Sequence, residues 1–195
     1  MQYSRREFLI STTGFMAMLA SPTLSARFSM DSIPKVVIEP HKKIGLSKLQ
    51  WQIMARVQEH LFPSEVNAPG AKDIYATAWL HNSLLMPNVE LNHLQFIRDG
   101  LINLEKLSQT NFQTDFLDLN TAQHETLLRK YEQDNTGNAW IREILRYIFE
   151  ALLSDPVYGG NHDGIGWKWL KHKSGFPLPP KDKRYYLVIA PYHSK

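Results

Sequence analysis

Apolar residues recur every three or four positions through the middle of the chain, and this spacing constrains the fold more than any other feature of the sequence. The first such stretch begins near Leu46, and its apolar face carries Leu49, Ile53, Val57 and Leu61. Ser47 and Gln50 have the spacing of a capping box, which marks a helix start, and Pro63 marks the end. We therefore predict a helix from about Leu46 to the residues just before Pro63.

The same periodicity predicts three further helices downstream. The second is expected over residues 72–86 and the third over residues 90–108. Asn120 and Gln123 form another capping-box pair, so a fourth helix is expected to begin there and to end near Glu132.

A fifth helix is predicted to follow a turn at residues 135–138 and to end at Ser154. Its apolar face consists of Trp140, Ile144, Tyr147, Ile148 and Leu152. No strand–helix–strand alternation appears, although residues 185–189 favour a short strand or an extended docking segment. The expected fold is all-α: residues 27–195 form one domain, a bundle of about five helices. It ends in an irregular, glycine- and aromatic-rich docking arm over about 155–195.

The first 26 residues have the composition of an export signal. Arg5 and Arg6 are followed by Phe8 and Leu9, and then by a modest apolar stretch with small residues toward Ala26. Adjacent arginines with an aromatic residue two places on are typical of the twin-arginine type, which carries folded proteins. The apolar stretch is less hydrophobic than a membrane span needs to be. An ordinary amphipathic N-terminal helix is the alternative.

The chain contains no cysteine, and its formal net charge is +3. The absence of cysteine excludes disulfides, thiolate zinc sites, cysteine-held iron–sulfur clusters and covalent haem c attachment in this chain. The sequence also lacks a glycine fingerprint of the dinucleotide-binding type after a strand, so we expect no flavin site in this chain. The charge is too small to indicate nucleic-acid binding.

A glycine-rich segment follows the fifth predicted helix. Residues 155–168 contain four glycines together with Tyr158 and Trp167, a composition that predicts a tight loop with aromatic anchors. This segment, with Gly175-Phe176-Pro177 after it, resembles the C-terminal signature of the gluconate 2-dehydrogenase subunit 3 family. The resemblance extends upstream to Gln50-Trp51, Leu61-Phe62-Pro63-Ser64, Pro69-Gly70-Ala71, Leu119 and Gln123.

The resemblance implies a small, exported, helical and non-catalytic subunit. Members of this family accompany a large FAD-dependent subunit, and often a multihaem cytochrome c subunit, in membrane-associated dehydrogenases of gluconate, sugars or polyols. The resemblance also implies that the chain assists maturation and twin-arginine export of the flavoprotein. It further implies that any FAD or haem c belongs to partner subunits and that the protein is periplasmic. We expect a structural and partner-facing role for Tyr158, Gly159, Gly160, Asn161, Asp163, Gly166 and Trp167.

Other interpretations concern the same region. His162 and Asp163 would be the reactive pair if the chain were a stand-alone exported enzyme, whereas in a glycine loop such side chains more often bond to the backbone. The basic, aromatic-rich stretch over residues 168–184 fits a docking arm, a solvated tail or, in a free-standing binding protein, a site for an anionic ligand. We expect the other histidines at surface or boundary positions; they include His41, His60, His81, His93 and His124.

Overall fold

The computed structural model of the chain describes residues 38–172, which belong to one compact unit. Its α-helices are α2 (Lys48–Leu61), α3 (Ala76–Leu85), α4 (Leu91–Phe112), α5 (Thr121–Gln133), α6 (Asn135–Leu153) and α7 (Ile165–Leu170). Three short 3-10 turns join them: η1 (Phe116–Asp118), η2 (Pro156–Tyr158) and η3 (His162–Gly164). Because the described part contains helices and no strand, the all-α prediction is confirmed. The predicted export signal and residues 185–189 lie outside this part of the chain.

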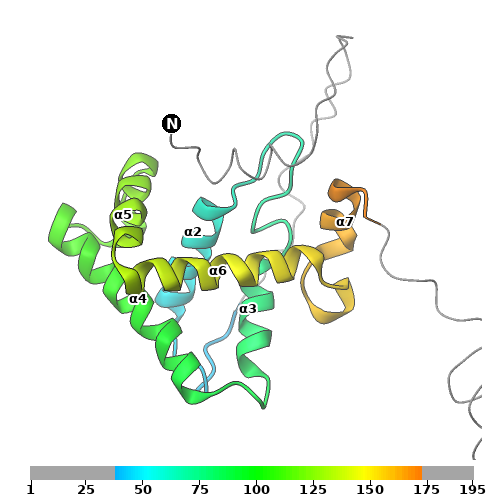
Figure 1. Cartoon of the computed structure of the whole chain (residues 1–195), viewed down its shortest axis with the longest axis horizontal. Coiled ribbons are helices and arrows are strands. Elements are labelled where there is room, and N and C mark those ends of the chain that lie inside the picture. Colours follow the sequence, from blue (N-terminus) through cyan, green and yellow to red (C-terminus); the bar gives the residue numbers. More distant parts are fainter. Residues whose placement is uncertain (1–37, 173–195) are drawn as a thin grey trace, which may run out of the picture. The chain divides into compact units, whose positions relative to one another are not determined.

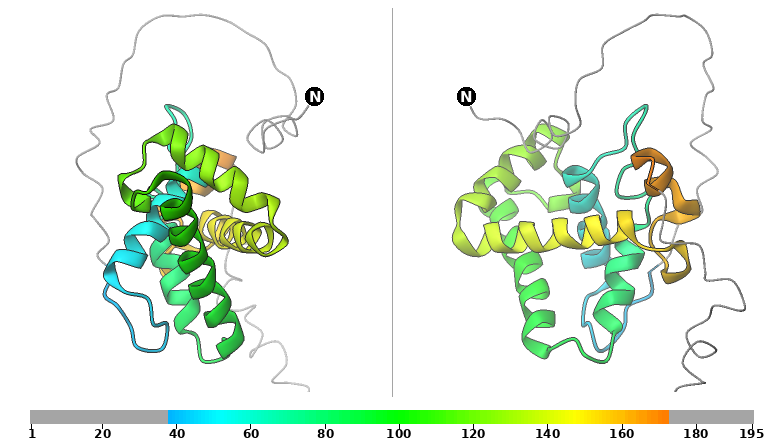
Figure 2. Two further views of the ribbon diagram at one scale, coloured as in Figure 1. Left: turned by 90° about the vertical axis from the view of Figure 1, so that its left-hand side faces the viewer. Right: turned by 45° about the vertical axis from the view of Figure 1, so that its right-hand side comes forward.

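Helix α6 is the central element of the described unit. It contacts α2, α3, α4, α5 and α7. Figure 1 shows α6 running across the other helices, with α5 near its first residues and α7 near its last. The second view of Figure 2 shows the same order, with α3 and α4 descending from α6 on one side. No helix within residues 38–172 combines the length and apolar character that crossing a membrane requires.

Both predicted capping boxes are present. The Ser47 hydroxyl accepts a hydrogen bond from the Gln50 backbone N–H, and the Gln50 side chain accepts one from the Ser47 N–H. Asn120 and Gln123 make the same reciprocal pair at the start of α5. Each pair satisfies two backbone N–H groups at the start of the helix. The sequence therefore located these two helix starts correctly.

The predicted turn at residues 135–138 is wrong, because these residues form the first turn of α6. Asp134 is the N-cap, and its carboxylate accepts hydrogen bonds from the backbone N–H groups of Thr136 and Gly137 at 3.0 and 3.1 Å. A carboxylate at this position stabilises a helix start through both hydrogen bonds and the helix dipole. The cap therefore outweighs the poor helix propensity of the residues that follow it.

Four other expectations need correction. Helix α3 begins at Ala76 rather than Lys72, because Tyr75 adopts a left-handed conformation (φ 57°) just before it. Helix α4 continues to Phe112, four residues beyond the predicted end. In α2, Leu49 is 54% exposed, and the buried face is formed by Trp51, Ile53, Met54, Val57 and Gln58. The C-terminal arm is also less irregular than expected, since it contains α7.

Trp140 on α6 is the largest fully buried side chain of the core. Its indole N–H donates to the Ile97 carbonyl of α4 at 3.1 Å, and its ring lies against Gly100 one turn later. A Cβ atom at Gly100 would lie 1.9 Å from the Trp140 ring. The Tyr131 hydroxyl of α5 donates to the Gly100 carbonyl at 3.0 Å. Helices α4, α5 and α6 therefore meet at a position that only glycine can occupy.

We expect Gly100→Ala to destabilise the protein by roughly 1–3 kcal/mol, because the added methyl group overpacks the contact with Trp140. In an ordinary helix interior the same substitution would be stabilising by roughly 0.5–1 kcal/mol. Chemical denaturation followed by circular dichroism measures the difference. Asn103→Ala, at an exposed position of the same helix, is the matched control and should be neutral or slightly stabilising. A more stable Gly100→Ala variant would contradict this packing.

The expectation that all the remaining histidines lie at the surface or boundary is wrong for His124. Its side chain is 4% exposed, its Nε2–H donates to the Phe116 carbonyl at 2.8 Å, and its ring lies edge-on to that of Phe116. Burial lowers the pKa of His124, because the protonated ring loses hydration in the core; the Phe116 hydrogen bond offsets part of this effect. His124 therefore stabilises the fold as a neutral side chain.

Folding lowers the pKa of His124. The contribution of His124 to folding stability is therefore fully present above the ordinary histidine pKa of about 6.5, and it is lost as the pH falls through the pKa of the folded state. His124→Gln keeps an N–H donor but removes the titration. We expect the free energy of unfolding of the unaltered protein, relative to that of this variant, to decrease as the pH is lowered from about 7.5 to about 5. Denaturant unfolding at a series of pH values tests this, with exposed His41→Gln as the control. Parallel pH profiles for His124→Gln and the unaltered chain would refute the assignment.

Candidate partner-binding loop

The glycine loop begins where α6 ends, at Ser154. The Asp155 carboxylate accepts a hydrogen bond from the Val157 N–H at 3.0 Å and starts the turn η2, with Pro156 at its first position. This turn presents two apolar side chains to solvent: Val157 is 78% exposed and Tyr158 is 65% exposed. The loop therefore exposes the kind of side chains that protein interfaces bury.

Asn161 holds the loop in place. The residue is fully buried, and its side-chain amide donates to the Ser154 carbonyl at 2.9 Å while its Oδ1 accepts from the Gly166 N–H at 2.7 Å. Its backbone N–H donates to the Ile74 carbonyl at 2.9 Å. One side chain thus joins the end of α6 to the start of α7, and its backbone attaches both to the segment before α3. These bonds provide partners for buried polar groups, which would destabilise the fold if they were left without hydrogen bonds.

Helix α7 packs closely against the end of α6. A Cβ atom at Gly166 would lie 2.4 Å from the Leu152 carbonyl oxygen, so only glycine permits this approach. The Trp167 indole N–H donates to the Leu153 carbonyl at 2.9 Å, and the Trp167 carbonyl accepts from the His172 N–H at 2.8 Å. Trp167 therefore attaches α7 to α6 and satisfies a carbonyl at the open end of α6.

Left-handed backbone conformations are concentrated in and around this loop. Asn161 and Asp163 have positive φ angles of 47° and 52°, and Tyr75, across from them, has a φ of 57°. Such conformations cost free energy in residues other than glycine and persist where the surroundings enforce them. Because Tyr75 lies against the loop by stacking on His162, the loop has a specific shape that the rest of the fold imposes.

His162 and Asp163 do not form a recognisable catalytic arrangement. The His162 ring stacks on Tyr75 with centroids 4.4 Å apart, and its Nε2 lies 3.4 Å from the Asp163 carboxylate. Burial, with a smaller effect of the Asp163 charge, raises the pKa of Tyr75. Within residues 38–172, no group of three metal-ligating side chains is found, and neither His162 nor Asp163 bonds to the backbone through its side chain. Asn161 and Asp155 make the loop-holding bonds that we expected from His162 and Asp163.

The seven predicted interface residues lie together but differ in exposure. Tyr158 and Asp163 are exposed, and Gly159 and Trp167 are half-buried. Gly160, Asn161 and Gly166 are buried. The buried residues therefore shape the loop, and only the others present atoms that a partner would contact.

An aromatic cluster that the sequence pattern does not predict lies beside the loop. Phe62, after α2, lies edge-on to Phe149 of α6 with centroids 6.5 Å apart, and edge-on to Trp169 of α7 with centroids 6.3 Å apart. Periodicity places Phe149 one residue away from the buried face of its helix, but it does not show that Phe62 and Trp169 meet it. Only the folded chain brings these three residues together.

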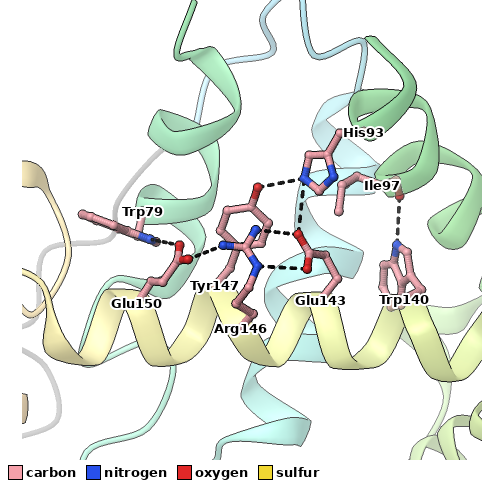
Figure 3. A network of polar contacts seen from close by, with 8 residues as sticks. All are labelled: Trp79, His93, Ile97, Trp140, Glu143, Arg146, Tyr147 and Glu150. Carbon is pink, nitrogen blue, oxygen red and sulfur yellow. Dashed lines mark hydrogen bonds and ion pairs between the residues drawn. The ribbon is translucent and has the colours of Figure 1, made fainter. Parts of the chain in front are cut away.

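A polar network fixes the neighbouring surface of α6 (Figure 3). Arg146 forms a two-pronged ion pair with Glu143, with contacts of 2.5 and 2.9 Å, and also pairs with Glu150. The Arg146 guanidinium holds the pKa of Glu143 below its usual range. His93 of α4 contacts both the Tyr147 hydroxyl, at 2.8 Å, and Glu143, at 3.4 Å. Because bidentate pairs restrict side-chain geometry, Arg146 is held in one orientation.

The fold and the loop together describe a small all-α protein whose distinctive feature is a braced glycine loop with exposed apolar side chains. A comparison with protein-family models places it more specifically. Residues 48–175 match the model described as gluconate 2-dehydrogenase subunit 3, and the chain belongs to that family. The match runs from α2 to beyond α7 and includes the glycine loop. Searches of the curated proteins and of the solved structures gave no match.

Asn161→Ala and Asn161→Asp separate the roles of the buried amide. Asn161→Ala removes both side-chain hydrogen bonds and should cost about 2–4 kcal/mol at every pH, because two buried backbone groups lose their partners. Asn161→Asp keeps the acceptor, and its carboxyl group can donate to the Ser154 carbonyl only when protonated. Burial disfavours the ionised form, so this variant should be close to the unaltered protein near about pH 4.5 and clearly less stable near about pH 7.5.

Denaturant unfolding of the three proteins at both pH values makes the measurement, with hydrogen exchange of residues 159–170 as a local readout. If Asn161→Asp and Asn161→Ala showed the same pH dependence, the amide would not be bonded as described.

Proposed function

We propose that this chain is the non-catalytic small subunit of an exported, FAD-dependent dehydrogenase that oxidises gluconate or a related sugar or polyol. The observation that carries the proposal is the family match, which spans the described helices and the glycine loop. In this proposal FAD, and haem c where a cytochrome subunit is present, belong to partner subunits. The complex lies in the periplasm, and its association with the inner membrane comes from the assembled subunits.

The arrangement of the glycine loop supports a binding role. Asn161 and Gly166 hold the loop by buried contacts and Trp167 by its bond to Leu153, so the exposed side chains of the loop are positioned before any partner arrives. Preorganisation reduces the entropy lost on binding. Tyr158 and Val157, which are exposed on a short turn, are the side chains that a partner would cover.

The N-terminal sequence supports a role in export. Arg5 and Arg6 fit a pathway that carries folded proteins, so a partner that lacks its own signal would have to bind this chain before translocation. The chain would then assist both the maturation and the transport of the flavoprotein through the twin-arginine translocase. A stand-alone enzyme would need more than His162 and Asp163, which lie on an exposed loop without a third group to complete a site among the described residues.

Replacing both Arg5 and Arg6 by lysine tests the proposal without altering the rest of the chain. We expect the flavoprotein subunit to accumulate in the cytoplasm with the variant chain, because the complex forms but is not exported. Cell fractionation with dehydrogenase assays, and flavin absorbance of the protein captured on a tagged chain, provide the measurement. The unaltered tagged chain, which should yield the flavoprotein from the periplasmic and membrane fractions, is the control.

Two results would count against the proposal. One is normal periplasmic dehydrogenase activity after deletion of this chain. The other is an unaltered tagged chain that is captured from native envelopes without any flavin-containing subunit.

A further inference from the structure

One long face of α6 is only partly covered by the rest of the described unit: Leu145 and Phe149 are half-buried, and Leu153 is exposed. It carries an apolar groove that is lined by Arg142, Leu145, Arg146, Phe149, Glu150 and Leu153. These positions are three or four residues apart and therefore share one side of the helix. At 1.5 Å per residue, the stripe is about 17 Å long, which is enough for about three turns of a second helix.

The groove continues onto the aromatic cluster. Phe149 lines the groove and contacts Phe62, which in turn contacts Trp169. At this end the apolar surface is exposed: Leu153 is 53%, Trp169 39% and Leu170 43% accessible. Exposed apolar side chains gathered in this way mark an interaction site more often than a solvent-facing surface.

The charges at this surface that no described residue compensates are positive. Arg142 is exposed and makes no ion pair with any residue between 38 and 172, and the same is true of Lys168 and Lys171, which flank Trp169 and Leu170 in the sequence. The carboxylate among the lining residues, that of Glu150, is engaged by Arg146 and by the Trp79 indole N–H (Figure 3). A complementary partner must therefore supply carboxylates beside apolar side chains.

We infer that the α6 groove binds an acidic amphipathic segment of the large dehydrogenase subunit. The inference rests on the proposed function and specifies where the partner binds. An amphipathic segment would place apolar side chains against Leu145, Phe149 and Leu153, with Asp or Glu near Arg142. The groove adjoins the glycine loop, since Leu153 lines the groove and its carbonyl accepts the bond from Trp167.

The same charges disfavour other occupants. A second copy of this chain, related by a two-fold axis, would bring like cations together. The chain's own C-terminal residues 173–195 are also basic, with Lys173, Lys181, Lys183, Arg184 and Lys195 against Asp182. An anionic membrane would satisfy the cations, but a flat surface would not fill a groove between Leu145 and Leu153.

Two charge-introducing substitutions, each with a matched control, test the groove. Leu153→Glu alters an exposed leucine of the groove, and Leu91→Glu alters a leucine that is 75% exposed at the start of α4. Arg142→Glu reverses a groove cation, and Lys106→Glu reverses an exposed cation on α4. Each full-length tagged variant is co-expressed with the large flavoprotein subunit. Its melting temperature and circular dichroism confirm folding.

We expect Leu153→Glu to reduce the flavoprotein captured per tagged chain by about tenfold, and Arg142→Glu by several-fold, with no change in either control. Flavin absorbance and the mass of the large subunit identify the captured protein. If all four variants captured the flavoprotein as the unaltered chain does, the groove would not be the binding site, although the proposed function would stand. If the unaltered chain itself captured no flavoprotein, the proposed function would fail as well.

Two further outcomes would assign the groove to another occupant and overturn the inference. One is binding of the unaltered chain to phosphatidylglycerol-containing vesicles that Leu153→Glu abolishes while flavoprotein capture persists. The other is a dimer of the unaltered chain, seen by light scattering, that Leu153→Glu dissociates without loss of flavoprotein.

Discussion

The contact between Trp140 and Gly100 determines how the helices are arranged. A buried indole can approach the α4 backbone this closely only because Gly100 lacks a side chain, and the hydrogen bond to Ile97 fixes its orientation. The same stretch of α4 also receives the Tyr131 hydroxyl from α5. Because this contact fixes the rotation of α6 about its axis, one face of the helix packs in the core and the opposite face lies toward the surface. The exposed groove is therefore a consequence of the core contact.

The polar contacts of α6 extend this constraint toward the surface. Arg146 is held between Glu143 and Glu150, and those two carboxylates also contact His93 of α4 and Trp79 of α3. An exposed arginine would ordinarily sample many rotamers, which a binding partner would have to restrict. Here the restriction is already present in the free chain. The groove is therefore bordered by ordered side chains as well as by an ordered backbone.

Local signals in the sequence were sufficient for much of the fold. Ser47 with Gln50 and Asn120 with Gln123 located two helix starts because a capping box is made by neighbours in the chain. The predicted turn at residues 135–138 is instead the first turn of α6, because the Asp134 cap outweighs the poor helix propensity of these residues. The bonds of Asn161 to Ser154 and Gly166 are also local, but its contact with Ile74, like the meeting of Phe62 with Trp169, joins distant segments. Periodicity carries no information about such contacts.

The exposure of the loop residues distinguishes those that shape the loop from those that a partner would contact. The family resemblance alone does not make this distinction. Asn161 and Gly166 belong to the signature but are buried, so their identity is explained by loop geometry without reference to a partner. Side chains that a partner would touch, such as Val157 and Leu153, require only an apolar surface of suitable shape. A common loop framework can therefore present different surfaces to different partners. If the proposed function holds, the side chains that select a dehydrogenase partner should lie at the exposed positions around the loop and along α6, while the buried residues fix the shape of the loop.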